Sequence, residues 1–369
     1  MRFLHSAMLL RPVNGIVAQM SWEQQAADQL GLSWQTRAFS AAEAKIPEAI
    51  RVDSGVKVSG QSKLKLAWAW IVFRIRYIRW LRAQTDVDVF VLRHSVHDPF
   101  QYFFIRSCPK PVYLVHHSKE LPELAGGGLI GKLRAAAEGV LGRWSIRRAA
   151  GVIGVTPELS VYECARAQQT DKYTVTYPNG VMYGSVAAAP MPDGRTEQIE
   201  LLFVASHFYD WHGLDLLLDA MERSKQDFRL HVVGIVFDAD LARCQQDPRI
   251  VLHGTLSAAQ IAALVERCWV GLTSFALDRK GMQQACTLKV REYLMLGLPV
   301  YSGHQDVFDA DFPFYRQAAV DMDTILDYAQ TVRAATKEQV SEQAKPFIAK
   351  TNLLAGLAQA LEGQGVKRI

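Results

Sequence analysis

Short runs of apolar residues alternate with helix-like segments along most of the chain, and this alternation limits the possible folds more than any other feature. The runs "PVYLVHH" (111–117), "GVIGVT" (151–156) and "LLFVAS" (201–206) are apolar at nearly every position. Strands of a parallel sheet have this pattern, because helices cover both faces of the sheet. The segments between the runs have helical spacing, as in "GLDLLLDAMERS" (213–224). The order therefore predicts doubly wound parallel sheets of the α/β class.

The length of the chain predicts two domains. A chain of 369 residues exceeds what one hydrophobic core usually serves. The stretch "VMYGSVAAAPMPDGRTEQ" (181–198) is rich in Gly, Ala and Pro and is the candidate linker. We therefore expect one domain over residues 1–180 and a second over 181–345. The sequence allows, but does not require, a terminal helix (346–369) that crosses back to the first domain.

Charge and cysteine usage restrict the class of protein further. Residues 1–180 contain 23 Lys and Arg against 14 Asp and Glu, whereas residues 181–369 contain 18 against 23. The basic first half favours an anionic neighbour. The five cysteines are scattered without a CxxC pair, which argues against a disulfide framework or a zinc site. No apolar run of about 18 residues is present. We expect a cytoplasmic protein, with peripheral contact to the inner face of the plasma membrane left open.

Polar residues gather where the predicted strands end. Parallel sheets bind ligands beyond the carboxyl ends of their strands, so these loops are the candidate site. Five of the ten histidines lie at or just beyond strand ends, namely His94, His97, His116, His117 and His207. His212 is close to the last of these.

One helix carries a charged pair at its beginning. In "QQACTLKVREYLMLGLPVYSGH" (283–304), Thr287 is a candidate N-cap, and Gly297 with a following proline ends the helix. Lys289 and Glu292 are three residues apart, so they lie side by side on the first turn. The free N–H groups and the dipole of that turn favour a bound anion. Taken alone, a surface ion pair is the simpler interpretation.

The surrounding motifs resemble those of retaining glycosyltransferases of the GT-B architecture, family 4-like, in group 1. The family pattern is a glutamate, seven residues, and a second glutamate in a helix that ends in a Gly-x-Pro-Val strand entry. Here Glu292 is followed by "YLMLGLPV". "YPNGV" (177–181), "FVASHFYDWHGLDLLLDA" (203–220) and "VLHGTLSAAQIAALVERCWVGLTSF" (251–275) resemble the other family segments, in order. The resemblance implies two facing Rossmann-like, doubly wound parallel-sheet domains.

The resemblance also implies a nucleotide-sugar site. Glu292 would accept hydrogen bonds from ribose hydroxyls, and Lys289 with the helix N-terminus would bind the pyrophosphate. The chain departs from the family at Gln284, which replaces the first glutamate, and in the donor loop, where the usual Arg and Lys are absent. Arg279 and Lys280 are candidates to restore that charge. The complete set of expected contacts is Glu292, Gln284, Thr287, Arg279, Lys280, His207, His212, Gly213, Gly254 and Gly15.

The implied activity is transfer of a sugar from a nucleoside-diphosphate sugar to a glycan acceptor with retention of configuration. His116 and His117 compete for the role of the histidine that points at the donor sugar, and Lys289 would stabilise the leaving diphosphate. We favour His116 because of its position after the strand. We expect no cofactor and no metal, because positive side chains and a helix terminus would take the place of a cation.

A basic amphipathic segment lies in the first half of the chain. Residues 63–82, "KLKLAWAWIVFRIRYIRWLR", contain no acidic residue and have an apolar stripe at helical spacing. Such a helix can lie on an anionic bilayer, or it can pack on the sheet with its arginines solvated. The first interpretation predicts a lipid-linked acceptor, and we see no nucleic-acid recognition module. The residues expected to touch membrane or acceptor are Arg74, Arg76, Arg79, Arg82 and Trp80.

Two other functions fit the same architecture. A sugar-nucleotide epimerase or hydrolase would rearrange or cleave its donor without an acceptor, and a two-lobed sugar-binding protein would catalyse nothing. The sequence does not define the base, the sugar or the acceptor.

Overall fold

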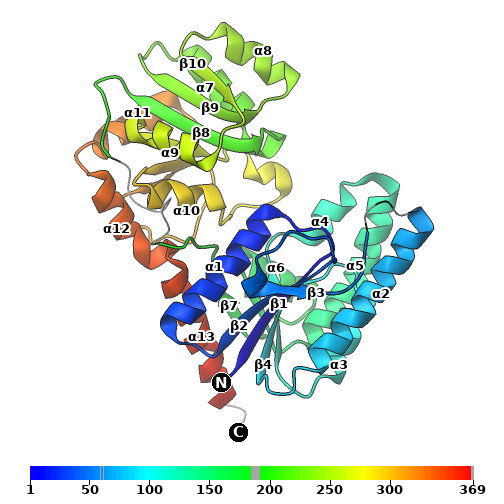
Figure 1. Ribbon diagram of the computed structural model, residues 1–369. Coiled ribbons are helices and arrows are strands. Elements are labelled where there is room, and N and C mark those ends of the chain that lie inside the picture. The colour runs from blue at the N-terminus through cyan, green and yellow to red at the C-terminus, as the bar shows by residue number, and fades with distance from the viewer. Residues whose placement is uncertain (59, 61, 184–191, 367–369) are drawn as a thin grey trace. The chain divides into compact units, whose positions relative to one another are not determined.

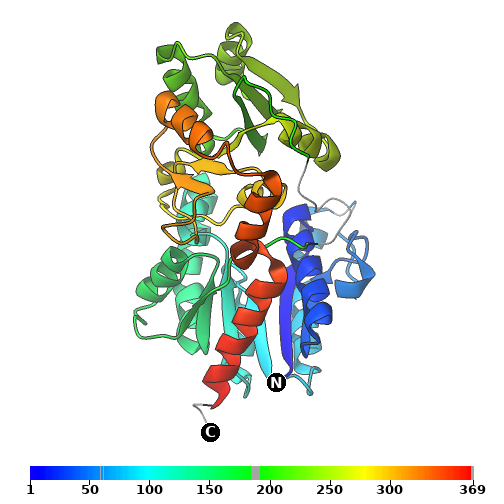
Figure 2. The same cartoon turned by 90° about the vertical axis from the view of Figure 1, so that its left-hand side faces the viewer.

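The computed structural model describes residues 1–58, 60, 62–183 and 192–366. The chain forms two compact units, Met1–Pro178 with Leu353–Ile369, and Asn179–Asn352. Part of the predicted linker, residues 184–191, lies outside the described residues. Figure 1 and Figure 2 show a sheet flanked by helices in each unit. Among the described helices, none is both long enough and apolar enough to cross a membrane.

Unit 1 contains a seven-stranded parallel sheet in the order β3-β2-β1-β4-β5-β6-β7. Its strands are β1 Phe3–Leu9, β2 Trp34–Ser40, β3 Arg51–Asp53, β4 Val89–Arg93, β5 Val112–His116, β6 Gly151–Gly154 and β7 Thr174–Thr176. Its helices are α1 Asn14–Leu30, α2 Lys63–Arg82, α3 Pro99–Ser107, α4 Glu120–Ala125, α5 Gly128–Arg148 and α6 Pro157–Arg166, with a short 3-10 turn at Glu48–Ile50.

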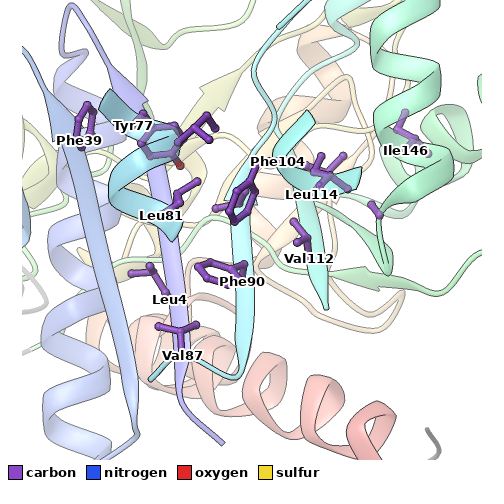
Figure 3. Close-up of a cluster of buried hydrophobic side chains, with 14 of the residues drawn as sticks. Leu4, Phe39, Tyr77, Leu81, Val87, Phe90, Phe104, Val112, Leu114 and Ile146 are labelled. Carbon is purple, nitrogen blue, oxygen red and sulfur yellow. The ribbon is translucent and has the colours of Figure 1, made fainter. Parts of the chain in front are cut away.

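The core of unit 1 lies on both faces of this sheet. On one face, α2, α3 and α5 pack against β1, β2, β4 and β5, where Phe39, Tyr77, Phe90 and Phe104 form a buried cluster (Figure 3). On the other face, Met20 of α1 packs against apolar residues of β1 and β2. Each fully buried side chain of this size contributes about 1.5–3 kcal/mol through removal of apolar surface from water.

A buried carboxylate joins four parts of unit 1. One Glu23 oxygen lies 2.6 Å from His5 Nδ1 and accepts hydrogen bonds from Trp34 Nε1 and the Thr36 hydroxyl. Its other oxygen accepts a hydrogen bond from the Tyr177 hydroxyl at 2.9 Å. Tyr177 begins the "YPNGV" segment, so this tyrosine fixes the end of unit 1 to β1, α1 and β2.

Unit 2 contains a six-stranded parallel sheet in the order β10-β9-β8-β11-β12-β13. Its strands are β8 Glu200–His207, β9 Arg229–Ile235, β10 Ile250–Gly254, β11 Val270–Thr273, β12 Val300–Ser302 and β13 Tyr315–Gln317. Its helices are α7 Leu214–Arg223, α8 Asp238–Gln246, α9 Ala258–Arg267, α10 Leu288–Met295, α11 Met322–Thr331 and α12 Lys337–Ile348, with 3-10 turns at Asp210–His212 and Leu277–Lys280. The terminal helix α13 spans Lys350–Val366, and most of it belongs to unit 1.

The strand orders define where each sheet should bind a ligand. Both sheets follow the 3-2-1-4-5-6 order of dinucleotide-binding folds, and in such sheets the ligand lies where the order reverses. In unit 1 this point lies between β1 and β4, and in unit 2 it lies between β8 and β11. The predicted doubly wound α/β fold is therefore confirmed for both halves of the chain.

Candidate functional site

The predicted anion-binding helix is α10. Thr287 occupies the N-cap position, but its hydroxyl makes no capping bond and has no partner among the described residues, although it is buried. Lys289 Nζ lies 2.6 Å from Glu292 Oε2, and each side chain is about one third exposed. The first turn of α10 thus offers unpaired N–H groups, a buried hydroxyl and an accessible ammonium group.

The end of α10 also matches the prediction. Gly297 has φ +82°, and a Cβ at this position would lie 2.3 Å from the backbone oxygen of Lys337. Only glycine fits there, because both the left-handed backbone and the contact with α12 exclude a side chain.

A buried ion pair holds α10 in place. Arg291 and Asp306 form a bidentate pair, with Arg291 Nη2 2.6 Å from Asp306 Oδ1 and both side chains fully buried. Arg291 Nε also donates to the Asn179 carbonyl, and the Asn179 side-chain amide donates to the Cys286 carbonyl at 2.6 Å. Bidentate pairs of this kind are strong and directional. The first turn of α10 is therefore fixed to the loop after β12 and to the start of unit 2.

The loop after β8 places two histidines near the switch point of unit 2. His207 ends β8 and stacks on Tyr209. His212 is 9% exposed, and its Nδ1 donates to the Tyr209 carbonyl at 3.2 Å. Burial, with a smaller effect of Lys280, lowers the pKa of His212 to about 4. A neutral imidazole of this tautomer presents the Nε2 lone pair, so the phosphate role of His212, which stays a prediction, would require protonation of Nε2.

Gly213 follows directly and occupies the N-cap position of α7. Its φ is +71°, and a Cβ would lie 2.9 Å from Phe275 Cβ in the loop after β11. At position 213, the loops after β8 and β11 therefore lie too close together for any residue with a side chain. The backbone bond from Phe275 N to the His212 carbonyl, 2.9 Å, joins them.

The long loop after β11 places its two basic residues differently. Arg279 is already paired: its guanidinium contacts the Asp215 carboxylate at 2.7 and 3.0 Å and the Asp210 carbonyl at 2.8 Å. Lys280 Nζ lies 5.1 Å from the centre of the Trp211 ring. Arg279 thus closes this loop onto the loop after β8, and Lys280 lies beside Trp211 of that loop.

The remaining predicted contacts of the donor site are spread along the chain. Gln284 pairs with Gln305 after β12, through an amide contact of 3.3 Å. Gly254 ends β10 with φ +63° and open space around its Cα. Gly15 lies in the first turn of α1 in unit 1. The structure gathers Gln284, Thr287, Lys289 and Glu292 on one segment, whereas Gly254 ends a strand two places from the switch point.

In unit 1, His116 ends β5 and is fully buried. Its Nδ1 lies 3.4 Å from Glu120 Oε2 and 3.5 Å from Glu163 Oε2, and its ring stacks on His94 with centroids 4.5 Å apart. Its Nε2 has no partner among the described residues. His117 is half-buried. His116 is thus enclosed by two carboxylates and a second histidine ring.

Three residues of this environment were not predicted from the sequence. Glu138 of α5 has one oxygen, Oε1, that lies 3.0 Å from His94 Nε2 and accepts a hydrogen bond from Arg166 Nη2 at 2.8 Å. Arg166 Nη2 also lies 2.6 Å from Glu163 Oε2. Burial opposes ionisation of Glu138, but His94 and Arg166 outweigh it and lower its pKa to about 2.

Two clusters that contain carboxylates have a spacing found in metal sites. Ligand atoms of His116, Glu120 and Glu163 lie within 4.8 Å of one another, close enough to share an ion. Asp238 and Asp240 open α8 three residues after β9 ends, which is an Asp-x-Asp triplet beyond a strand.

The basic helix α2 differs from the prediction at two positions. Arg74 does not lie on the exposed face: its Nε is 3.1 Å from Asp98 Oδ2, the aspartate is fully buried, and the guanidinium stacks on Trp70. Trp80 packs partly into the core beside Phe39. The arginines that the structure leaves exposed on this helix are Arg76, Arg79 and Arg82.

Comparisons with known proteins agree with this geometry. Residues 198–306 match the family model "Glycosyl transferases group 1". This segment contains β8 to β12 and α10. No curated protein sequence matches the chain.

Solved structures resemble the whole chain. The apo form of the lipopolysaccharide outer core galactosyltransferase WaaB is 12% identical with a TM-score of 0.66, covering 99% of this chain and 100% of that one. Sucrose-phosphate synthase from Thermosynechococcus elongatus is 13% identical with a TM-score of 0.65, covering 99% and 100%. HepE from Anabaena, solved with UDP-glucose, is 12% identical with a TM-score of 0.64, covering 98% and 100%.

These likenesses define the class of fold. At 12–13% identity they show a fold of the GT-B type, with two parallel-sheet α/β domains. Together with the group 1 match over residues 198–306, they support a glycosyltransferase.

Proposed function

We propose that this protein transfers a sugar, with retention of configuration, from a nucleoside-diphosphate sugar to a glycan acceptor, and that the acceptor is lipid-linked. The observation that carries the proposal is the first turn of α10. There Lys289, Glu292 and the buried, unpartnered Thr287 hydroxyl lie on the segment that matches group 1 glycosyltransferases. The complex of HepE with UDP-glucose supports a nucleotide sugar as the donor.

The chemistry of this turn suits a leaving diphosphate. The Lys289 ammonium group and the helix N-terminus provide positive charge where negative charge develops as the glycosidic bond to the diphosphate breaks. The Glu292 carboxylate can accept hydrogen bonds from vicinal hydroxyls of a ribose. Lys289 and Glu292 form an ion pair, and a ligand with both a diol and a diphosphate can engage both charges.

The first test is an assay for products. The purified protein is incubated with labelled nucleotide sugars and a lipid-linked or free glycan, and the products are separated by mass. A glycan heavier by one sugar residue supports transfer, and its anomeric configuration tests retention. Isomerised nucleotide sugar, or free sugar without an extended glycan, would instead indicate an epimerase or a hydrolase.

We predict that the reaction does not depend on a divalent metal. The positive groups around α10 would take the role that a cation has in other transferases. Activity should therefore persist in EDTA, and Asp238→Asn with Asp240→Asn should leave it nearly unchanged. Complete loss of activity in EDTA with rescue by Mn²⁺, or loss in the double variant, would contradict the prediction.

The proposed lipid-linked acceptor rests on the surface of unit 1. Five large apolar side chains are 66–85% exposed at the beginnings of two helices: Leu64 and Trp68 of α2, and Leu129, Ile130 and Leu133 of α5. A helix that follows a parallel strand begins at the carboxyl edge of the sheet, so both groups lie at the edge where ligands bind. Lys57, Lys65 and Arg76 line a cavity of about 560 Å³ with Val56, Trp68 and Val72. Exposed apolar residues among basic ones are typical of an interfacial membrane surface.

We expect Arg76, Arg79 and Arg82 to contribute to binding of anionic membranes. Changing all three to Gln should weaken binding to vesicles that contain phosphatidylserine by about 1 kcal/mol per residue, because the attraction to anionic headgroups is Coulombic. The effect should disappear at high salt, where charges are screened over a few ångströms. Sedimentation with vesicles measures this, and the Arg243→Gln variant, at a partly exposed position in unit 2, serves as the control.

The apolar groups have a different signature. Trp68→Ser and Ile130→Ser should reduce the vesicle binding that remains at high salt, since insertion of apolar side chains is not screened. Wild-type protein that does not sediment with anionic vesicles, or that sediments equally well after all of these changes, would exclude α2 and α5 as the membrane surface.

A further inference from the structure

The buried groups around His116 contain more negative than positive charge. Three carboxylates surround the histidines at the ends of β4 and β5: Glu120 of α4, Glu138 of α5 and Glu163 of α6. Glu120 and Glu163 contact His116, and Glu138 contacts His94. The side chains of Glu138 and Glu163 are fully buried, and that of Glu120 is 14% exposed. Unpaired charge in such a place is costly, so compensation is expected within the cluster.

Two guanidinium groups supply part of the compensation. Arg166 contacts Glu138 at 2.8 Å and Glu163 at 2.6 Å. Arg93, at the end of β4, interacts electrostatically with Glu120, and although burial lowers the pKa of Arg93 to about 10, it stays charged at neutral pH. Against three carboxylates, one positive charge is still missing, and two imidazoles face the cluster. His94 contacts Glu138, which Arg166 already contacts, whereas His116 lies between Glu120 and Glu163. His116 is therefore the better placed of the two to supply the charge.

We propose that His116 is an imidazolium ion at neutral pH, held in that state by the carboxylates of Glu163 and Glu120. Both carboxylate oxygens face Nδ1, at 3.5 and 3.4 Å, so Nδ1 carries a proton in either charge state of the ring. The second proton, on Nε2, completes the charge balance of the cluster. Glu163 is then a positioning residue, because it sets the charge and orientation of His116 without contacting a ligand.

The balance of effects on His116 supports this assignment. Burial opposes protonation, and Arg166 opposes it weakly, but Glu163 and then Glu120 outweigh both and raise the pKa of His116 above its usual value. His94 stacks on the His116 ring, and Tyr162 interacts electrostatically with Glu163 and Glu120. In the same way, burial opposes ionisation of Glu120, but His116 outweighs it and lowers the pKa of Glu120.

A proton fits this position better than a divalent cation does. His116, Glu120 and Glu163 have metal-ligand spacing, but Arg166 Nη2 lies 2.6 Å from the Glu163 oxygen that faces His116. A divalent ion beside that guanidinium would meet a like charge at close range. The proton on His116 adds a single charge between the two carboxylates and displaces no residue.

The charge of His116 determines what its free nitrogen can do. As an imidazolium, the ring has an Nε2–H donor with no partner among the described residues, whereas the neutral ring would present a lone pair. The donor form matches an oxygen acceptor, such as a sugar hydroxyl or a phosphate oxygen. This consequence for the ligand rests on the proposed function, whereas the charge state itself does not.

The assignment also predicts a sign for the pH dependence of stability. A group whose pKa is raised by folding stabilises the folded state at pH values below its unfolded pKa, about 6.5 for histidine. That contribution is lost as the pH rises through the folded pKa of His116. The free energy of unfolding of unit 1 should therefore fall as the pH rises above about 6.5, and Glu163→Gln should reduce this fall.

Nitrogen-15 NMR of histidine-labelled protein tests the proposal directly. The His116 signals, identified by their loss in His116→Gln, should show both ring nitrogens protonated at about pH 7, above the ordinary pKa of about 6.5. Glu163→Gln should lower the His116 pKa by about 1 to 3 units, because it removes one adjacent negative charge. Glu158→Gln is the matched control: Glu158 lies on the same helix α6 but pairs with Lys119 at 2.7 Å.

Several results would overturn the proposal. A neutral His116 ring at about pH 7 in the wild-type protein would do so even if Glu163→Gln does not fold. A His116 pKa that Glu163→Gln and Glu158→Gln leave equally unchanged would do so too. Perturbation of Nδ1 by stoichiometric Zn²⁺ or Mn²⁺ would assign the site to a metal instead. In the transfer assay, the alkaline limb of the pH–rate profile should move with the His116 pKa in Glu163→Gln. Absence of any transfer would reject the proposed function, while the NMR titration would still decide the charge of His116.

Discussion

Lys289→Ala should weaken binding of a nucleoside diphosphate by about 10- to 150-fold, which corresponds to about 1.5–3 kcal/mol for one hydrogen bond to a charged group. The ammonium group lies on the first turn of α10 beside unpaired backbone N–H groups. Its loss removes the accessible cation of that turn, because the other one, Arg291, is fully buried against Asp306. Glu292→Gln should weaken binding by a similar factor if a ribose is bound. Isothermal titration calorimetry with UDP and GDP measures both effects.

The chain offers a matched control for this prediction. Lys345 and Glu342 form an ion pair with the same i, i+3 spacing, at 2.5 Å and with similar exposure, on α12. Lys345→Ala removes an equivalent surface pair away from the N-terminus of α10, and should leave the affinity unchanged. If Lys289→Ala and Lys345→Ala bound a nucleoside diphosphate equally well, the Lys289–Glu292 pair would be an ordinary surface ion pair.

Arg291→Ala should lower the free energy of unfolding of unit 2 by about 3–5 kcal/mol. The change leaves the Asp306 carboxylate buried without its partner and removes the bond from Arg291 Nε to the Asn179 carbonyl. Hydrogen exchange of the peptides that contain α10 and the loop after β12 measures the loss locally. Because α10 also carries the proposed anion site, the affinity for a nucleoside diphosphate should fall with it.

The control for Arg291 is an exposed arginine in the same unit. Arg243 pairs with Asp219 at 2.6 Å and with Glu222 at 2.8 Å on the surface. Arg243→Ala should cost at most about 1 kcal/mol, because exposed ion pairs are screened by water. If Arg291→Ala were as mild as Arg243→Ala, the pair with Asp306 would not be what fixes α10.

The fold followed from the apolar runs wherever a strand is buried on both faces, as at β5 and β8. Three strands, β2, β3 and β13, were not predicted from the sequence, each for a specific reason. In β2, "WQTRAFS", polar residues interrupt the run, because Thr36 reaches the buried Glu23 and Arg37 lies half-buried at the surface. The strands β3 and β13 have three residues each and lie at sheet edges, so they are too short to show a period.

The candidate site was predictable only where its signals are local. Thr287, Lys289, Glu292 and Gly297 lie within one turn-helix-turn segment, whose start and stop have sequence signatures. The environment of His116 has no such signature, since its partners come from three helices and meet only through packing. A local pattern cannot show that Glu163 faces a strand almost fifty positions earlier in the chain.

The α2 arginines, which the sequence analysis grouped together, lie in different surroundings for a geometric reason. Two residues along a helix are separated by a rotation of about 200°, so Arg74 and Arg76 point to nearly opposite sides. Arg74 therefore turns toward Asp98 at the beginning of α3, whereas Arg76 stays at the surface and donates to the Ser54 carbonyl at 2.6 Å. The sequence contains the charge of each residue, but only packing decides which one solvent reaches.

The most direct test of the central claim is a thermal-shift measurement over nucleoside diphosphates and their sugars, made in parallel on wild-type protein, Lys289→Ala and Lys345→Ala. A ligand that binds the native state raises the melting temperature by mass action. The account predicts that at least one of these ligands stabilises wild type and Lys345→Ala equally, and stabilises Lys289→Ala much less. A ligand that raises the melting temperature of all three proteins by the same amount would place the nucleotide away from α10 and contradict the account.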